Sequence, residues 1–162
     1  MAAAHYGVVF KLDAAGNETV LFSFSAISDG TYPVSSLVLD SAGNLYGTAK
    51  SGGAEPDGGV VFKLDPTGHE TVLHMFKPSG GCLPKAGLVF DSDGNLYGTT
   101  SDCGQGKSGT VYKLDKAGHE TVLCYTASRA ARTGLSRGEE WYSTQPATCT
   151  DLPRLAEFRM GA

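Results

Sequence analysis

A chain of 162 residues has the length of one domain, and its 22 glycines, 7 prolines, 7 phenylalanines and 7 tyrosines are typical of many short strands joined by tight turns. The net charge of -4 argues against a basic surface for nucleic acid or an anionic membrane, and no run of about 18 apolar residues exists to cross a bilayer. We therefore expect neither a nucleic-acid partner nor insertion into a membrane.

The chain is a repeat array. The segment Val8-Val9-Phe10-Lys11-Leu12-Asp13 returns as residues 60–65 and, with two changes, as residues 110–115. Its aromatic residue recurs after 52 residues, from Phe10 to Phe62, and again after 50, at Tyr112, which is a spacing typical of one β-propeller blade. The array over residues 1–126 therefore divides into units 7–58 and 59–108 and an incomplete unit, 109–126.

Each complete unit contains two strand-turn-strand patterns. In the first unit residues 7–13 precede 18–24, and residues 35–40 precede 45–50; the second unit repeats this arrangement over residues 59–76 and 87–101. We expect the two hairpins of one unit to form one four-stranded antiparallel sheet. Radial stacking of such sheets gives a β-propeller of about 4 to 8 blades, so the sequence predicts an all-β, partial propeller of about two and a half blades.

All five turns share one signal, an Asp followed by two variable residues, a Gly and then Asn or His. The Asp carboxylate can accept backbone N–H groups, and the Gly can take the left-handed conformation. These turn residues are Asp13, Gly16, Asp40, Gly43, Asp65, Gly68, Asp91, Gly94, Asp115 and Gly118. His69 and His119 stand where the first unit has Asn17, so we expect a tolerance of left-handed geometry there, not a titrating role.

A calcium site is a weak candidate at one turn. Asp91, Asp93 and Asn95 alternate as oxygen ligands do at the start of a calcium loop, but the distal bidentate Glu is missing. The matching turn of the first unit has Ala42 where Asp93 stands. This favours a plain hairpin turn.

Cys82 and Cys103 lie symmetrically about the turn at residues 91–94. Antiparallel pairing that continued beyond the strands would bring them together as a disulfide. The alternative is a pair of free thiols on splayed loops, since thiols in the cytosol stay reduced. The sequence leaves both open.

Two further sets of residues recur with the scaffold. Glu18, Glu70 and Glu120 begin the second strand of each first hairpin, and we expect solvated strand ends. Tyr46 and Tyr97 are each followed by Gly-Thr; they could line a carbohydrate-binding groove, but packing of an aromatic ring over a glycine between blades is favoured.

The strings Gly-Val-Val-Phe-Lys-Leu-Asp, Gly-Xaa-Glu-Thr-Val-Leu and Asp-Ser-Xaa-Gly-Asn-Leu-Tyr-Gly-Thr resemble the bacterial tandem repeat called GloVer, which occurs in large cell-surface proteins with varied C-terminal anchors. The resemblance covers roughly residues 5–126 and implies a propeller-like array, an extracellular or cell-surface location and a non-catalytic role. The chain departs from that pattern, since we recognise neither a signal peptide nor an anchor in it and expect that it is not exported by itself.

Composition changes after Thr126. All five arginines, from Arg129 to Arg159, follow it, whereas every lysine precedes it. When the possible codons of residues 143–151 are read one nucleotide out of register, they permit Asp-Ser-Ala-Gly-Asn-Leu-Tyr-Gly, the turn that the third unit lacks. We interpret residues 127–162 as a poorly ordered tail produced by a frameshift, and the chain as a fragment of a longer array.

Neither a Ser-His-Asp spacing nor a phosphate-binding loop occurs, so we expect no catalytic residue and no cofactor. The favoured function is a non-enzymatic structural or binding fragment of a bacterial surface propeller. One alternative is a carbohydrate- or protein-binding module that self-associates through exposed blade faces. Another is a metal-dependent propeller hydrolase of the lactonase type, which would need inward carboxylates that differ between blades.

Overall fold

The structure is a computed structural model in which residues 6–104 and 108–125 are described. These residues form short strands joined by turns and loops, and none of them lies in a helix that could span a membrane. The strands are β1 (Val8–Leu12), β2 (Glu18–Ser23), β3 (Val38–Leu39), β4 (Leu45–Ala49), β5 (Val60–Leu64), β6 (Glu70–Met75), β7 (Cys82–Pro84), β8 (Val89–Phe90), β9 (Leu96–Asp102), β10 (Thr110–Leu114) and β11 (Glu120–Tyr125).

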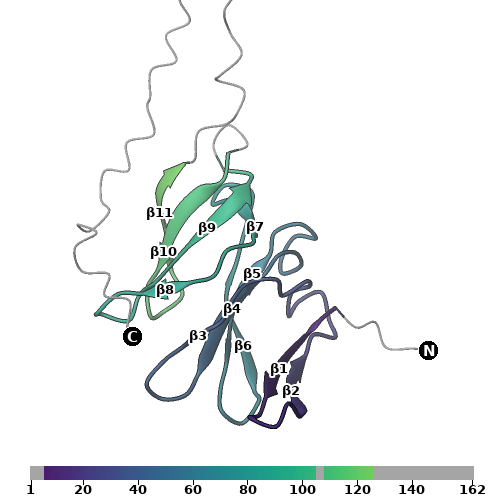
Figure 1. Cartoon of the computed structure of the whole chain (residues 1–162). Helices are drawn as coiled ribbons and strands as arrows, with labels where there is room; N and C mark the ends of the chain where they lie inside the picture. The colour runs from purple at the N-terminus through teal and green to yellow at the C-terminus, as the bar shows by residue number, and fades with distance from the viewer. Residues whose placement is uncertain (1–5, 105–107, 126–162) are drawn as a thin grey trace, which may run out of the picture.

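The strands form three antiparallel sheets (Figure 1). The middle sheet has the order β3-β4-β5-β6. In the C-terminal sheet β10 lies between β9 and β11, while β7 and β8 pair with successive parts of β9. Strands β1 and β2 form a two-stranded sheet. The fold is therefore all-β, with the sheet composition of a partial propeller of about two and a half blades, as the sequence predicts.

The sheets do not coincide with the sequence units, and the expectation that the two hairpins of one unit pair together is wrong. Strand β4, from the first unit, pairs with β5, from the second, over the register Leu45↔Leu64 to Ala49↔Val60. Strands β9 and β10 make the corresponding connection. The reason is that the glycine-containing loop after β4 reverses the chain, so that β5 returns along β4. Strands β10 and β11 of the third unit thus complete a sheet, and the half blade is β1–β2.

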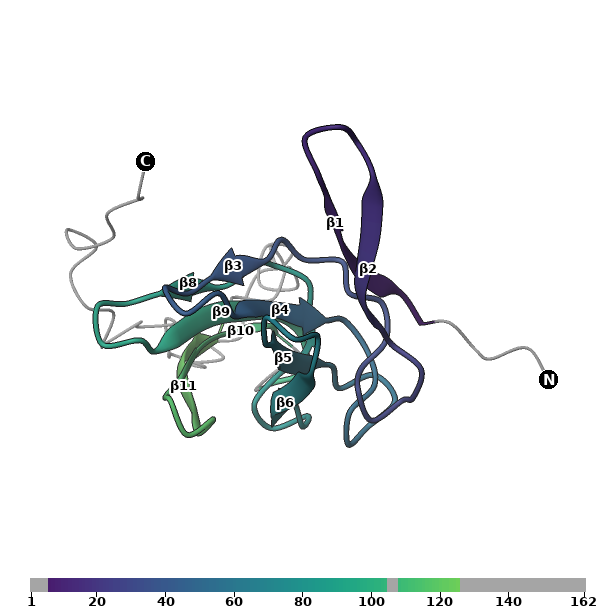
Figure 2. The same cartoon turned by 90° about the horizontal axis from the view of Figure 1, so that it is seen from below.

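The apolar cores lie between consecutive sheets. One cluster joins the β1–β2 hairpin to the middle sheet through Val9, Phe24 and Phe62. The other joins the middle sheet to the C-terminal sheet through Phe76, Leu88, Tyr112 and neighbouring residues. Figure 2 shows the sheets fanning apart, with β3 and β8 on the same side of the array. Each sheet therefore depends for its buried surface on the sheet beside it.

Candidate functional site

The turn aspartates are occupied by their own turns. Asp13 Oδ1 accepts the backbone N–H groups of Ala15 and Asn17 at 2.9 and 2.8 Å, and Asp13 Oδ2 accepts Asn17 Nδ2 at 2.8 Å. The carboxylates of Asp40, Asp65, Asp91 and Asp115 accept the same two backbone donors. The pKa of Asp40 falls to about 2, chiefly because Asn44 donates a side-chain hydrogen bond to the carboxylate. Such a carboxylate stays ionised and does not exchange protons near neutral pH.

The left-handed residue of each turn is the glycine, at φ values of 85, 85, 88, 81 and 82° for Gly16, Gly43, Gly68, Gly94 and Gly118. The expectation of left-handed geometry at Asn17, His69 and His119 is wrong, because none of them is among the described residues with positive φ. Their common feature is a backbone N–H donated to the aspartate. The His119 ring adds a contact of 3.0 Å between Nδ1 and Asp115 Oδ2.

The calcium candidate has the bonding of a plain turn. Asp91 Oδ1 accepts the N–H groups of Asp93 and Asn95, and its Oδ2 accepts Asn95 Nδ2 at 2.7 Å and the Tyr97 hydroxyl at 3.1 Å. A carboxylate has about four lone-pair sites, and these four donors occupy them. Asp91 therefore has no free lone pair to offer a cation in this conformation.

A cleft of about 520 Å³ lies between the middle and C-terminal sheets. Three turns border it through Asp40, Asp91 and Asp115, and Lys63 and Lys116 add positive charge. The other lining residues used below are Ser41, Tyr46 and Phe90. The cleft thus combines fixed charges of both signs with an aromatic wall, and these are features that suit a small ligand.

The two recurrent tyrosines differ in exposure to this cleft. Tyr46 lines it, packs edge-on against Phe90 of the next sheet with ring centres 5.1 Å apart, and donates its hydroxyl to Asp40 at 3.0 Å. Burial, together with the Asp40 charge, raises the pKa of Tyr46 to about 12. Tyr97 is buried, with Lys113 Nζ 5.9 Å from its ring centre. Aromatic rings of the adjacent strands also pack on the glycines that follow these tyrosines: Phe62 lies against Gly47, and Tyr112 lies against Gly98.

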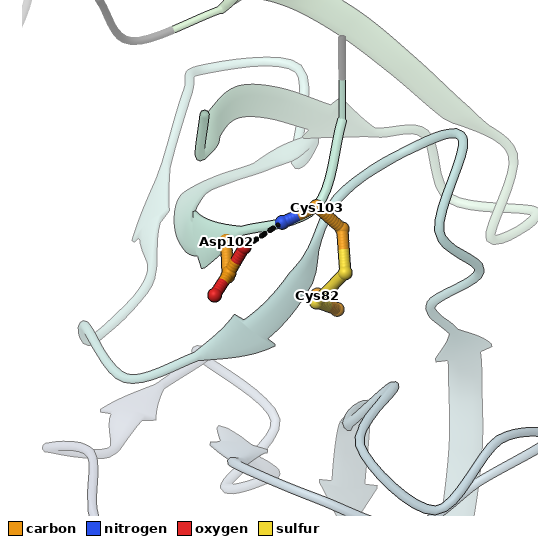
Figure 3. A group of neighbouring side chains, drawn as sticks. All are labelled: Cys82, Asp102 and Cys103. Carbon is orange, nitrogen blue, oxygen red and sulfur yellow. Dashed lines mark hydrogen bonds between the residues drawn. A yellow bond between two sulfur atoms is a disulfide. The ribbon is translucent and has the colours of Figure 1, made fainter. Parts of the chain in front are cut away.

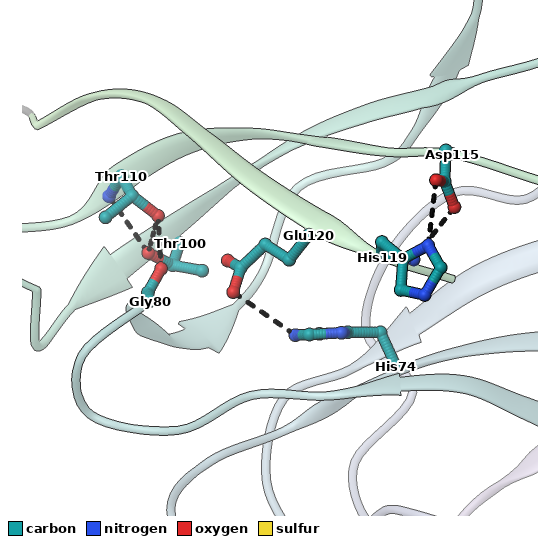
Figure 4. A network of polar contacts seen from close by, with 7 residues as sticks. All are labelled: His74, Gly80, Thr100, Thr110, Asp115, His119 and Glu120. Atoms are coloured by element: carbon teal, nitrogen blue, oxygen red, sulfur yellow. Dashed lines mark hydrogen bonds and ion pairs between the residues drawn. The ribbon is translucent and has the colours of Figure 1, made fainter. Parts of the chain in front are cut away.

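The recurrent glutamates are solvated strand ends only at Glu18, which is exposed. Glu120 reaches the preceding sheet, where its Oε2 lies 3.4 Å from His74 Nε2 (Figure 4). The two groups are close enough for an ion pair but are not aligned as a hydrogen bond. Glu70 Oε1 is buried without a hydrogen-bond partner, and burial, with the nearby charge of Asp29, raises the pKa of Glu70 to about 7. The expectation fails because sheet stacking covers these positions.

Polar groups beside this pair bind one another. The hydroxyls of Thr100 and Thr110 lie 2.8 Å apart, and the Thr110 hydroxyl donates to the Gly80 carbonyl oxygen at 2.9 Å (Figure 4). The sequence analysis did not identify the His74–Glu120 contact. One signal was available, since His74 stands where the other units have Phe22 and Cys124.

Cys82 and Cys103 are joined by a disulfide, with Cα atoms 5.3 Å apart (Figure 3). This is the first of the two alternatives that the sequence leaves open. Asp102 lies beside the bond and accepts the Cys103 N–H at 2.6 Å. The three residues have the spacing of metal ligands, but cysteine binds metal as a thiolate. With both sulfurs in the disulfide, this group is a covalent link between β7 and the end of β9.

The sequence pattern described as the Gloeobacter/Verrucomicrobia repeat matches residues 2–141 of the chain. The match continues past Thr126, into the segment that the composition predicts to be out of frame. That predicted tail, residues 127–162, lies outside the described residues. No curated protein sequence matches the chain.

Proposed function

Because the chain belongs to the Gloeobacter/Verrucomicrobia repeat family, we propose that this repeat module is a non-enzymatic structural and binding part of a bacterial cell-surface protein. The observation that supports this proposal most is the hydrogen bonding of the turn aspartates that recur in every repeat. In all five turns the aspartate accepts N–H groups of its own turn. The aspartates that recur in every turn therefore stabilise the hairpins.

The cleft between the two complete sheets is the surface that such a module would use for binding. Tyr46 and Phe90 present aromatic surface, and Lys63 and Lys116 can donate hydrogen bonds. Aromatic rings beside polar donors suit a carbohydrate, whose faces are apolar and whose edges carry hydroxyl groups. We propose a carbohydrate as the ligand, with a protein segment as the alternative.

A steric block tests the cleft. Ser41 is exposed and lines it, so Ser41→Trp fills the cleft without altering the core. The matched control is Ala14→Trp at the same position of the β1–β2 turn, which is exposed and does not line the cleft. In titration calorimetry with soluble cell-wall oligosaccharides, we expect Ser41→Trp to abolish the binding heat and Ala14→Trp to retain it. Equal heats for both variants would exclude the cleft as the binding site.

A screen for hydrolysis tests the non-enzymatic role. Lactone, ester and glycoside substrates are incubated with the chain, with and without added Ca²⁺ or Zn²⁺. We expect no turnover above the rate of buffer with metal alone. Metal-dependent turnover that survives repurification would overturn the proposal in favour of a hydrolase. A separate experiment tests the surface location. If the protein lies at the cell surface, protease added to intact cells should digest it.

A further inference from the structure

The opening strand β1 has the same sequence as β5, Val-Val-Phe-Lys-Leu, but it has one strand neighbour fewer. Strand β5 lies between β4 and β6, and the related strand β10 lies between β9 and β11. Among residues 6–104 and 108–125, β1 pairs with β2 alone. The unpaired edge of β1 therefore corresponds to the edge that β5 offers to β4 and that β10 offers to β9.

The hairpin at this edge is built like its counterparts. Strands β1 and β5 each carry a register shift before the aromatic residue in their pairing with the next strand. The Phe24 N–H donates to Gly7 O at 3.0 Å, as the Phe76 N–H does to Gly59 O at 3.0 Å. The difference between β1 and β5 is therefore the missing neighbour and not the local conformation.

The aromatic side chain of β1 is exposed where the equivalent side chains of β5 and β10 are covered by an adjacent strand. Phe10 is 48% exposed, whereas its counterparts Phe62 and Tyr112 are 1% and 0% exposed. Both counterparts pack on a glycine of the adjacent strand: Gly47 is opposite Phe62 and Gly98 is opposite Tyr112. A Cβ atom on Gly47 would lie 2.8 Å from Phe62 Cζ. The adjacent strand must therefore present a glycine for the aromatic ring to be covered.

We propose that the β1 edge binds an antiparallel strand of the sequence Leu-Tyr-Gly-Thr, presented by an unpaired hairpin of another repeat of this family. The register follows from the two complete sheets, in which Leu45 is opposite Leu64 and Thr48 is opposite Val61. In β1 the bound leucine would face Leu12, the glycine Phe10 and the threonine Val9. Backbone hydrogen bonds supply affinity in such strand addition, and the side chains supply specificity.

A second copy of this chain in the same fold is not the predicted donor. Its two hairpins of this kind, β3–β4 and β8–β9, already pair with β5 and β10. The donor is therefore another repeat whose Leu-Tyr-Gly-Thr strand has no partner of its own. This inference depends on strand pairing alone and is independent of the proposed surface function.

A peptide corresponding to residues 87–101, which includes Leu96-Tyr97-Gly98-Thr99, tests the proposal on the full chain. We expect the peptide to bind and to slow amide hydrogen exchange of residues 8–12, as measured by NMR. The control peptide carries Gly98→Val. We expect it to bind about tenfold more weakly, because its side chain must enter the space that the Phe10 ring occupies.

The variant Phe10→Ala closes a double-mutant cycle, and Phe10 is exposed enough for the variant to fold. With this variant, we expect the parent peptide and the Gly98→Val peptide to bind with similar affinity. No protection of residues 8–12, or equal affinity of both peptides for the parent chain, would overturn the proposal. A dimer of the chain alone whose β1 amides are already protected would also overturn it, since the partner would then be a second copy.

Discussion

Glu70 and Glu120 occupy the same register position in consecutive sheets, opposite Leu64 and Leu114, but their surroundings differ. Glu120 lies 3.4 Å from His74, whereas Glu70 has a buried, unpaired oxygen. The position of His74 is held in the β1–β2 hairpin by Phe22, which cannot carry a charge. One substitution between repeats therefore decides whether a buried carboxylate has a basic neighbour.

Glu70 makes stability depend on pH. Its pKa rises from 4.5 to about 7 on folding, so the folded chain holds the proton more tightly than the unfolded chain. Its contribution to stability is thus full below pH 4.5 and declines as pH rises to about 7. In urea unfolding, we expect Glu70→Gln to stabilise the chain at pH 8 relative to the parent and to have little effect at pH 4.5. Glu18→Gln, at the exposed equivalent position, should change neither. An equal effect of Glu70→Gln at both pH values would contradict this assignment.

At the scale of the elements, two of the turns lie directly against the neighbouring sheet. Gly118 closes the β10–β11 turn, and a Cβ atom there would meet the Leu73 carbonyl oxygen of β6. Gly68 makes the same approach to Leu21, at 3.0 Å. Gly16 has nothing within 4 Å of the corresponding point. The three glycines share a positive φ, so only the contact distinguishes them.

This contrast predicts unequal costs for one substitution. Gly16→Ala should cost about 1 kcal/mol, the strain of a left-handed alanine. Gly118→Ala adds a collision with backbone, which should bring a further cost of roughly 1–3 kcal/mol. Chemical denaturation of the two variants measures the difference. Equal free energies of unfolding for the two variants would show that the β10–β11 turn does not pack closely against β6.

The disulfide acts on an element that has a noncovalent counterpart in the first unit. Thr31 pairs with Ser51 there as an isolated bridge, at the positions that correspond to Cys82 and Asp102. Cys103, which follows Asp102, has a φ of 62°, and the equivalent residue is Gly52. The covalent link thus fixes the start of β7 to the end of β9, where the first unit has only hydrogen bonds.

Removal of this link has a predictable magnitude. The cysteines are 21 residues apart, and closing a loop of that length stabilises a fold by about 3 kcal/mol in the chain-entropy description. We expect the double variant Cys82→Ser, Cys103→Ser to lose about that much free energy of unfolding. Thr31→Ala keeps the two backbone hydrogen bonds that Thr31 forms with Ser51, so it should cost less than about 1 kcal/mol. A similar loss for both would mean that the disulfide does not constrain the unfolded chain.

In the whole molecule, two separate apolar clusters stabilise a row of three sheets. Phe24 contacts Phe62 in the first cluster, and Phe76 contacts Tyr112 in the second. Both Phe24 and Phe76 are fully buried. Because the middle sheet contributes to both clusters, the array resembles a linear chain of nearest-neighbour contacts.

Independent interfaces should give additive losses. We expect Phe24→Leu and Phe76→Leu each to cost about 1–1.5 kcal/mol in urea unfolding, and the double variant to lose their sum within about 0.5 kcal/mol. A much larger or smaller loss would show that the two clusters act as one core. Each single variant should also raise amide hydrogen-exchange rates, and the increase should be largest in the two sheets that its cluster joins.

The sequence predicts local structure well because turns and hairpins depend on local chemistry. The five Asp-Gly turns and the strands beside them follow from residues within a few positions. Sheet membership does not follow in this way. Strands β1 and β5 share one sequence, yet β5 is largely buried and β1 largely exposed. Neighbours far along the chain decide that difference, as they decide the burial of Glu70 and Glu120 and the cleft beside Tyr46.

The half-unit offset between repeats and sheets has a consequence for how such genes can change length. The middle and C-terminal sheets each take one hairpin from each of two successive units. Duplicating a whole unit, wherever the cut falls, preserves the alternation of hairpins and adds one sheet. Duplicating a single hairpin places two hairpins of the same type in succession, and neither supplies the strand that the other needs. We therefore expect arrays of this kind to change length in steps of one full repeat, and the same rule applies to engineered extensions of the array.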